Sequence, residues 1–303
     1  MPKLEYLVAS FVLLISIGAN AAYIEILNGP PTAFHVERDT KKIKKIAPFM
    51  PLQIGDKITV RNPPKKSQHI CDKKCSITLA LDGGIFKTLI YADTQEKPYI
   101  VTATDSTNVV TGVMNTFYVW FHRLWKNDIQ SLVEVNTQGD NTHKIPLSMR
   151  LFKGNNAKLI ARERALHLAW HGGKSPYQIQ VSQKGTKKVL WDEKNIKQSE
   201  ITLKKQLITA GRYQVIVNDA RGKTVIGEFT AVTDIPSLFQ HPETQIIEQS
   251  NLSALSKKTL LAAWLAKQGG WHFEAYQKIA MIAGYYPAQL VKQGLERGKR
   301  PTK

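Results

Sequence analysis

Two cysteines are the residues of this sequence most able to form a covalent bond or to bind a metal. Cys71 and Cys75 are its only cysteines, and three residues lie between them. In an oxidising compartment paired thiols become disulfides, and three intervening residues allow the two sulfurs to meet. The closed loop is short, so the bond restricts the unfolded chain only slightly. We therefore expect a structural disulfide with a local effect.

Two other chemistries remain open for these thiols. A metal site would recruit His69, but two thiolates and one imidazole leave a tetrahedral metal without its fourth ligand. A redox site would place two residues between the cysteines, beside a thioredoxin-like pattern. Both fit the spacing less well than a structural bond does, and the sequence indicates no metal and no cofactor.

His167 and His171 also stand at a spacing that invites a metal site. On a helix, residues four apart share one face. On a strand, which the surrounding sequence predicts, they lie about 13 Å apart at ~3.3 Å per residue. One ion does not bridge that distance without an intervening turn, so we assign no metal to this pair.

The sequence motifs of several common enzyme classes are absent. We find no GxxxxGKS or GxxxxGKT phosphate loop, no GxGxxG, no GxSxG and no HExxH. A catalytic site would have to assemble in space from scattered Ser, His and Asp residues. The sequence favours a non-catalytic protein and assigns no catalytic residue. A hydrolase, or an enzyme accessory, with a site between domains is one alternative.

The first twenty-one residues have the three parts of a secretory signal peptide. Lys3 gives a positive start, residues 6–17 (YLVASFVLLISI) form an uncharged apolar run, and Ala19-Asn20-Ala21 supplies small residues before a cleavage site. The alternative is an uncleaved membrane anchor. The run is shorter than the roughly 20 residues of a membrane-spanning helix, which favours the signal peptide. We expect cleavage after Ala21 and a periplasmic or secreted protein.

Residues 22–105 have the alternating pattern of short strands separated by turn residues. The segment LQIGDKITV (52–60) places a Gly-Asp turn before a strand, and a second strand ends at Asp82-Gly83-Gly84. This order resembles the periplasmic β domain of FecR-type proteins. The resemblance implies a periplasmic binding or scaffolding module without catalytic residues. Because FecR-type proteins regulate sigma factors, a periplasmic sensor component of a signalling system is a second alternative.

Residues 106–131 predict an amphipathic helix that connects two β domains. Val109, Val113, Phe117 and Leu124 recur at the three- and four-residue spacing of one helical face. One interpretation is that this face covers the N-terminal β domain. The other is contact with a partner or a membrane surface, for which aromatic rings serve as anchors. Under that hypothesis the contact residues are Phe117, Tyr118, Phe121 and Trp125.

Residues 132–233 are again rich in strands, with seven candidates that begin at Ile145–Leu151. The segments LAWHGG (168–173) and AGRYQVIVNDARGK (210–223) resemble those of bacterial immunoglobulin-like and fibronectin-III-like domains. The resemblance implies a β-sandwich in which Trp170 and Tyr213 belong to the core. It implies nothing specific about function.

The C-terminal part predicts a linker followed by helices. Pro236 and Pro242 mark a linker over 234–250, and a helical segment with a basic tail follows over 251–303. Three helices are expected there, over 257–268, 271–283 and 287–298. The fold class is therefore mainly β: two β domains, a connecting helix and a C-terminal helical segment. In that segment the candidate partner-binding residues are Lys257, Lys258 and Trp271.

Positive charge dominates the sequence. Lys and Arg number 42 against 24 Asp and Glu, a formal net charge of +18. Residues 36–75 alone hold eleven basic residues against four acidic ones. An exported protein does not meet nucleic acid, so the polyanions it meets are lipopolysaccharide, anionic lipid headgroups, teichoic-type polymers and acidic polysaccharides. We expect an exported, non-catalytic scaffolding or binding protein of the envelope, which contacts a protein partner or an anionic envelope polymer. The alternative for the positive charge is that it only keeps the protein soluble.

Export predicts the chemical state of the mature chain. Protein isolated from an envelope fraction should begin at Ala22 on N-terminal sequencing, and its cysteines should react with an alkylating reagent only after reduction. A full-length chain in the cytosol, with both thiols alkylated without reductant, would contradict this expectation.

Overall fold

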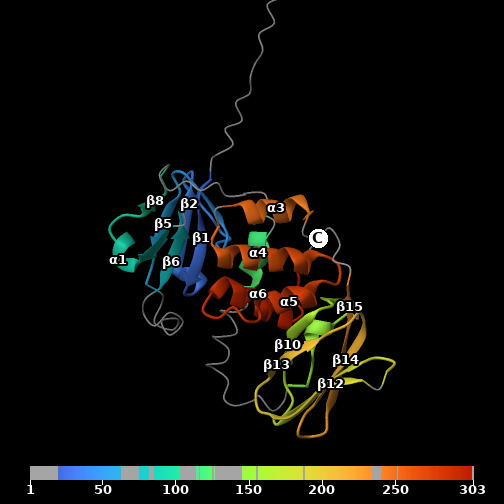
Figure 1. Cartoon of the computed structure of the whole chain (residues 1–303). Helices are drawn as coiled ribbons and strands as arrows, with labels where there is room; N and C mark the ends of the chain where they lie inside the picture. The colour runs from blue at the N-terminus through green and yellow to red at the C-terminus, as the bar shows by residue number, and fades with distance from the viewer. Residues whose placement is uncertain are drawn as a thin grey trace, which may run out of the picture.

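The computed structural model describes residues 20–62, 75–81, 85–102, 114–115, 117–124, 126, 145–154, 156–186, 188–233, 240–250 and 252–301. Strands hold 38% of the described residues and helices 28%, so the described part of the chain is mostly β-sheet, which confirms the mainly β class. Figure 1 shows two groups of strands with C-terminal helices between them. The expected signal peptide lies outside the described residues, apart from the backbone of residues 20 and 21.

The first group, here the N-terminal β unit, consists of two four-stranded antiparallel sheets. Their strand orders are β4-β1-β6-β7 and β3-β2-β5-β8. A short helix, α1 (Tyr91–Thr94), follows β7. The strands are β1 (Asn20–Asn28), β2 (Phe34–Arg38), β3 (Lys41–Lys42), β4 (Pro51–Gln53), β5 (Lys57–Val60), β6 (Ser76–Ala80), β7 (Phe86–Ile90) and β8 (Tyr99–Ile100).

The Gly-Asp turn of this unit is held by a buried carboxylate. Gly55 has a φ of +90°, which favours glycine. Asp56 is 1% exposed, and its carboxylate accepts bonds from Arg38 Nε (2.8 Å), Arg38 Nη2 (2.7 Å) and the Gln53 amide (2.8 Å). Charge-assisted bonds of this bidentate kind are strong, so they fix the turn that begins β5 and join it to β2.

The second group, here the second β unit, contains seven strands in two sheets. Their orders are β10-β13 and β12-β11-β14-β15-β9, and only the β15–β9 pair is parallel among these described strands. Trp170 and Tyr213 are both 1% exposed. The strands are β9 (Ala157–Ile160), β10 (Glu163–Ala169), β11 (Tyr177–Gln183), β12 (Val189–Ile196), β13 (Glu200–Leu207), β14 (Gly211–Asn218) and β15 (Thr224–Val232).

The strand expected over Ile145–Leu151 is not present. That segment forms one isolated bridge, between Ser148 and His171, and then a 3-10 helix over Arg150–Phe152. Phe152 occupies the space above Gly227, where an added Cβ would lie 2.5 Å from its ring, and its ring centroid is 4.8 Å from that of Phe273. The apolar residues of this segment therefore fill the space between sheet and helix instead of forming a ladder. β9 forms the edge strand in its place.

The expected linker over 234–250 contains a helix, α3 (Pro242–Gln249). The His241 side chain accepts a bond from the Glu243 amide at the N-terminus of α3, and Pro242 occupies a first-turn position where its missing N–H is harmless. Trp264 Nε1 donates to Glu243 Oε2 at 2.6 Å. Only residues 240–250 of the expected linker are described, and these are fixed to the helices that follow.

Those helices are close to the three that the sequence predicts: α4 (Ala254–Lys267), α5 (His272–Ile279) and α6 (Tyr286–Glu296). The turn between α4 and α5 lies against β9, where Lys158 donates its amide proton to the Gly270 carbonyl at 2.8 Å. Gly270 has a φ of +84°, and a Cβ there would lie 2.4 Å from the Asn156 carbonyl oxygen. Only glycine fits this approach.

The described part of the basic tail is packed against the protein. Arg300 Nη2 donates to the Lys153 carbonyl at 2.5 Å and lies 3.1 Å from His272 Nε2. Lys299 donates its amide proton to the Gly294 carbonyl at 2.8 Å. These bonds fix the tail to the helices and to the segment before β9 as far as residue 301.

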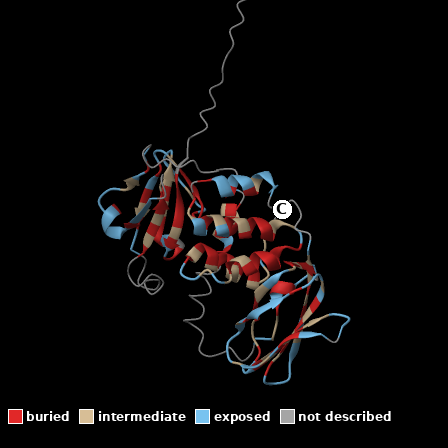
Figure 2. Cartoon of the chain, in the orientation of Figure 1, coloured by how far each residue is buried: buried red, intermediate tan, exposed pale blue. Residues whose placement is uncertain are grey.

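The apolar core is continuous through both β units and the helices. Figure 2 shows buried residues along β1, through α4 and α5, and into the second β unit. The described helical residues 117–124 take part, because their inward face packs in the same core. The rings of Phe121 and Phe49 lie edge-on at 4.9 Å. The buried residues of this face, together with one just before it, are Met114, Phe117, Trp120, Phe121 and Leu124.

A buried glutamate links the N-terminal β unit to the helices. Glu25, on β1, is 2% exposed and accepts bonds from Ser256 Oγ (2.8 and 3.0 Å) and from the Tyr285 hydroxyl (2.5 Å). Ser256 lies in the first turn of α4, whose N-cap is Ser253, and Tyr285 is the N-cap of α6. Burial raises the pKa of Glu25, and the hydrogen bonds from Tyr285 and Ser256 oppose that rise.

A second set of buried polar groups links α5 to the second β unit. Glu274 is fully buried and accepts bonds from Arg164 Nη1 (2.6 Å) and the Ile160 amide (3.1 Å). One turn later the Gln277 amide group bonds both backbone groups of His167, at 2.8 and 2.9 Å. Gln277 thereby provides hydrogen-bond partners for backbone groups on the edge of β10 that does not face β13. The helix takes the place of a neighbouring strand there.

Glu25 predicts how stability depends on pH. Because its pKa is higher folded than unfolded, the folded chain binds the proton more tightly, and the free energy of unfolding should fall as pH rises above about 4.5. Glu25→Gln removes the ionisation and keeps an acceptor oxygen. Denaturant titrations from pH 4.5 to 7.5 should show the variant gaining stability relative to the wild type as pH rises. Glu163→Gln, at an exposed position, is the control; equal pH profiles for wild type and Glu25→Gln would contradict the account.

Candidate functional site

A strongly charged surface is formed by a run of lysines that begins in β3 and continues past it. Asp39 and Thr40 form the turn of the β2–β3 hairpin with φ values of +47° and +63°, as in the tight turns that join antiparallel strands. Lys41, Lys42, Lys44 and Lys45 follow and are exposed, while Ile43 between them is half-buried. The Ile43 amide donates to the Val36 carbonyl at 2.8 Å, which fixes the run against β2. We call residues 41–45 the lysine ridge.

A groove lies on each side of the lysine ridge, and Lys42, Ile43 and Lys44 belong to both. The larger, about 340 Å³, is the Tyr118 groove, and the smaller, about 180 Å³, is the His122 groove. Besides the shared residues, the first is lined by Arg38, Lys45, Met50, Pro51, Asn115 and Tyr118, and the second by Thr32, Phe34, Ile46, Arg61 and His122.

Among the described residues, neither groove has an acidic residue in its lining. Within the described part of the chain, Lys42, Lys44 and Lys45 form no ion pair with a carboxylate. Arg38 differs, because Asp56 neutralises it. The pKa of neighbouring His35 is lowered first by burial and then by the charges of Arg61 and Lys42. This surface therefore has a positive potential.

The helical residues 117–124 hold the outer wall of both grooves. His122 Nδ1 lies 2.8 Å from the Ile46 carbonyl oxygen, so this nitrogen carries a proton and donates it. Phe121 packs on Phe49, whose amide donates to the Ile24 carbonyl at 2.7 Å. The segment that lines the grooves is therefore fixed between the helix and β1, and both grooves are preformed.

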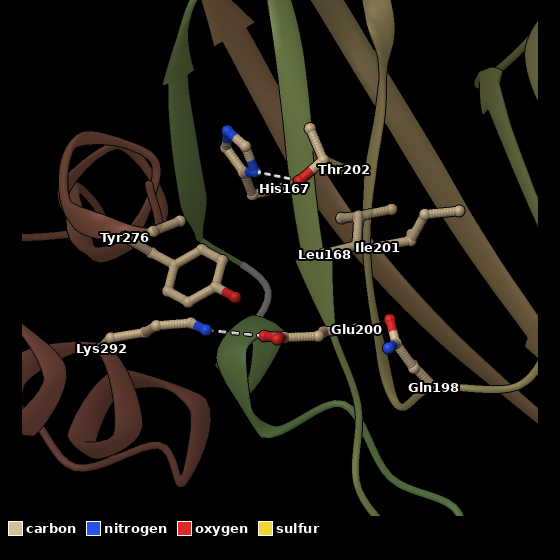
Figure 3. A pocket seen from close by; sticks show the side chains of 9 residues that line it. His167, Leu168, Gln198, Glu200, Ile201, Thr202, Tyr276 and Lys292 are labelled. Carbon is tan, nitrogen blue, oxygen red and sulfur yellow. Dashed lines mark hydrogen bonds and ion pairs between the residues drawn. The ribbon is translucent and has the colours of Figure 1, made fainter. Parts of the chain in front are cut away.

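A separate pocket of about 140 Å³, here the junction pocket, lies where the second β unit meets α5 and α6. Figure 3 shows the side chains of Tyr276 and Lys292 pointing from the helices toward Glu200 on β13. Lys292 Nζ is 2.6 Å from Glu200 Oε2 and 3.8 Å from Glu296 Oε1. The Tyr276 hydroxyl donates to Glu296 Oε1 at 3.0 Å. Burial raises the pKa of Glu296, and the charge of Lys292 opposes that rise.

The imidazole in this pocket is neutral near pH 7. Burial, followed by the charges of Arg164 and Lys292, lowers the pKa of His167. Its Nδ1 lies 2.8 Å from Thr202 Oγ1, as Figure 3 shows. The imidazole, the hydroxyls and the ion pair thus bond to one another or to the chain, which favours a structural role for the pocket at this junction.

The predicted partner-binding residues divide into buried and accessible ones. Phe117, Phe121 and Trp271 are 1%, 0% and 4% exposed and belong to the core. Tyr118 is half-buried and lines a groove, and Lys258 is exposed. Lys257 Nζ donates to the Glu248 carbonyl at 2.6 Å. Trp125 lies outside the described residues.

The predicted disulfide is described at one end only. Cys75 is buried, at 4% exposure, and no described cysteine is free. Cys71 and His69 lie outside the described residues, so the bond stays a prediction. In the part of the chain that the structure describes, no three His, Cys, Asp or Glu residues form a metal-binding group. His167 and His171 have separate partners, since His171 Nε2 lies 3.2 Å from the Glu296 carbonyl oxygen.

Sequence analysis missed five residues that line the two grooves: Lys42, Lys44, Lys45, Arg61 and His122. The sequence does indicate the charge of this surface, because four lysines follow a short turn in a strongly basic part of the sequence. The two grooves themselves had no signal, since they require a helix some 70 positions later to pack beside the ridge.

Comparison with known proteins found no family model, no curated protein and no solved structure that matches this chain. A search of the described helices found none that is both long enough and apolar enough to cross a membrane.

The junction pocket predicts a contrast between Lys292 and Lys205, each of which pairs with an exposed glutamate. Lys292→Met should lower the free energy of unfolding by about 1–2 kcal/mol, because Lys292 also lies 3.8 Å from the half-buried Glu296 carboxylate, which then loses its lysine. Lys205→Met breaks a 2.8 Å pair with Glu163 in which both side chains are more than half exposed, and should change it by less than about 0.5 kcal/mol. Chemical denaturation at pH 7 measures both; equal effects would contradict the structural role.

Proposed function

We propose that this protein is an exported, non-catalytic binding protein of the cell envelope, and that its N-terminal β unit holds an anionic envelope polymer on the lysine ridge. The observation that supports this most directly is the charge of Lys42, Lys44 and Lys45, which form no ion pair among the described residues and lie between two preformed grooves. A surface that only keeps the protein soluble needs charge but does not need a fixed backbone or grooves.

The lysine ridge acts on anionic groups in close contact with it and only weakly on distant ones. At physiological ionic strength, charges are screened over about 8–10 Å, so the ridge attracts only groups that approach it closely. Each lysine near an anionic surface contributes about 1 kcal/mol. Several lysines on one fixed hairpin add these contributions without the entropy cost of ordering a disordered segment.

The proposal that the protein is non-catalytic is supported by the junction pocket. Its strongest acid–base groups, Glu200, Lys292 and Glu296, pair with one another. His167 has no described carboxylate as a hydrogen-bond partner, because its bond is to Thr202. A nucleophile with a general base and an orienting third group, the pattern of covalent catalysis, is not assembled among these residues.

We also propose that the second β unit is an immunoglobulin-like sandwich. Tyr213 lies near the start of β14, the penultimate strand, and its hydroxyl donates to the Thr209 carbonyl at 2.8 Å. This is the tyrosine corner of such domains. The five-stranded sheet also pairs its last strand with its first in parallel. The FecR-type proposal for the N-terminal β unit is supported by the Asp56-stabilised turn.

Binding of inorganic polyphosphate tests the proposed function. The double variant Lys42→Gln/Lys44→Gln should bind polyphosphate roughly 30-fold more weakly than the wild type at low salt, as expected from about 2 kcal/mol for two cations. Lys194→Gln/Lys204→Gln removes two exposed lysines of the second β unit and serves as the matched control. Fluorescence anisotropy with labelled polyphosphate measures both; equal losses in the two double variants would refute a localised site.

A further inference from the structure

The two grooves beside the lysine ridge combine positive charge with apolar walls. Ile43 stands between Lys42 and Lys44 and lines both grooves. Met50 and Pro51 add apolar surface to the Tyr118 groove, and Phe34 and Ile46 add it to the His122 groove. A fully hydrated polyanion gains from the lysines but nothing from these walls, because its own surface is polar throughout.

The Tyr118 groove has the size and composition of a small-molecule site. Its volume of about 340 Å³ lies within the range of roughly 300–1,000 Å³ in which such sites fall. Such sites are mostly apolar, with few polar groups that fix the orientation of the ligand. Tyr118 has a ring and a hydroxyl that suit a boundary between apolar and wet surroundings. The other polar residues of the lining are Arg38, Lys42, Lys44, Lys45 and Asn115.

The groove is also rigid. The Arg38 guanidinium donates to the Pro51 carbonyl at 3.1 Å and to the Asp56 carboxylate, so one wall is fixed to the turn before β5. The opposite wall is held by the Phe121 and His122 contacts. A preformed apolar groove lets an acyl chain bind without first ordering the protein.

From these observations we infer that the lysine ridge binds the acylated, phosphate-bearing end of an envelope amphiphile, with the phosphate between Lys42 and Lys44 and the acyl chain in the Tyr118 groove. The inference rests on the proposed function and specifies its ligand. Of the polyanions expected in an envelope, it selects those that carry lipid over those that are water-soluble along their whole length.

Three soluble probes separate net negative charge from the acyl chains. Dihexanoyl phosphatidic acid has both, glycerol 3-phosphate has the anionic phosphate alone, and dihexanoyl phosphatidylcholine has the chains with a zwitterionic phosphodiester headgroup of no net charge. By titration calorimetry below the micelle concentration, phosphatidic acid should bind at least ten-fold more tightly than either of the other two probes.

Two matched variants locate the apolar contribution. Ile43→Ser should weaken binding of dihexanoyl phosphatidic acid at least five-fold, and by more than it weakens polyphosphate binding, while its circular dichroism spectrum stays that of the wild type. Ile54→Ser changes a residue that is 51% exposed and lies outside both grooves, and it should change neither affinity.

The outcomes distinguish this inference from the proposal on which it rests. Equal affinity for phosphatidic acid and glycerol 3-phosphate, or an Ile43→Ser variant with unchanged lipid affinity, overturns the amphiphile and leaves polyanion binding standing. Polyphosphate binding that Lys42→Gln/Lys44→Gln does not weaken overturns both. Equal affinity for phosphatidic acid and phosphatidylcholine also overturns the inference, because the net negative charge of the headgroup would then have no role.

Discussion

The structure depends on buried polar groups that are satisfied only across long distances in the chain. Glu25 on β1 is buried, and a buried carboxylate without partners is costly. Its partners, Ser256 and Tyr285, come from helices formed more than 200 residues later. The same principle applies at the other end of the helical layer, where Glu274 and Gln277 satisfy Arg164 and backbone groups of β9 and β10. Each β unit thus has polar groups that only the C-terminal helices complete.

The shape of the candidate surface follows from this arrangement. α6 packs against the helical residues 117–124, since Leu124 lies where a Cβ on Gly294 would be. Those helical residues in turn hold the walls of both grooves through Phe121 and His122. The lysine ridge is local in sequence, but the shape beside it is a product of the whole core.

Local patterns predicted much of the secondary structure. Period-two alternation located most strands of both β units, and capping residues with Ala- and Leu-rich runs located α4 to α6 within a few residues. Two assignments were wrong for a tertiary reason. The segment 145–151 alternates like a strand, but Phe152 after it fills the space above Gly227. The segment 234–250 reads as a linker because of its prolines, yet Pro242 begins α3.

The sequence predicts the positive charge of the candidate site but does not predict its grooves. Four lysines within residues 41–45 are evident in the sequence, and Tyr118 was singled out for its ring. Phe117 and Phe121 were singled out for the same reason but are buried. Helical periodicity shows which residues share a face, and it does not show whether that face is covered. Grooves arise where segments distant in sequence meet, and a single sequence has no local signal for that.

The separation between Glu25 and its partners also bears on how the chain reaches its native state. Synthesis proceeds from the N-terminus, so β1 exists for the time needed to add over 200 residues before α4 and α6 can cover it. During that interval the N-terminal β unit exposes apolar surface and a carboxylate without its hydroxyl donors. Docking of this unit on α4 and α6 follows the synthesis of those helices, and a chain that ends near residue 250 lacks both hydroxyl donors to Glu25. Molecular chaperones that shield nascent β-sheet would therefore have their longest engagement with this end of the protein.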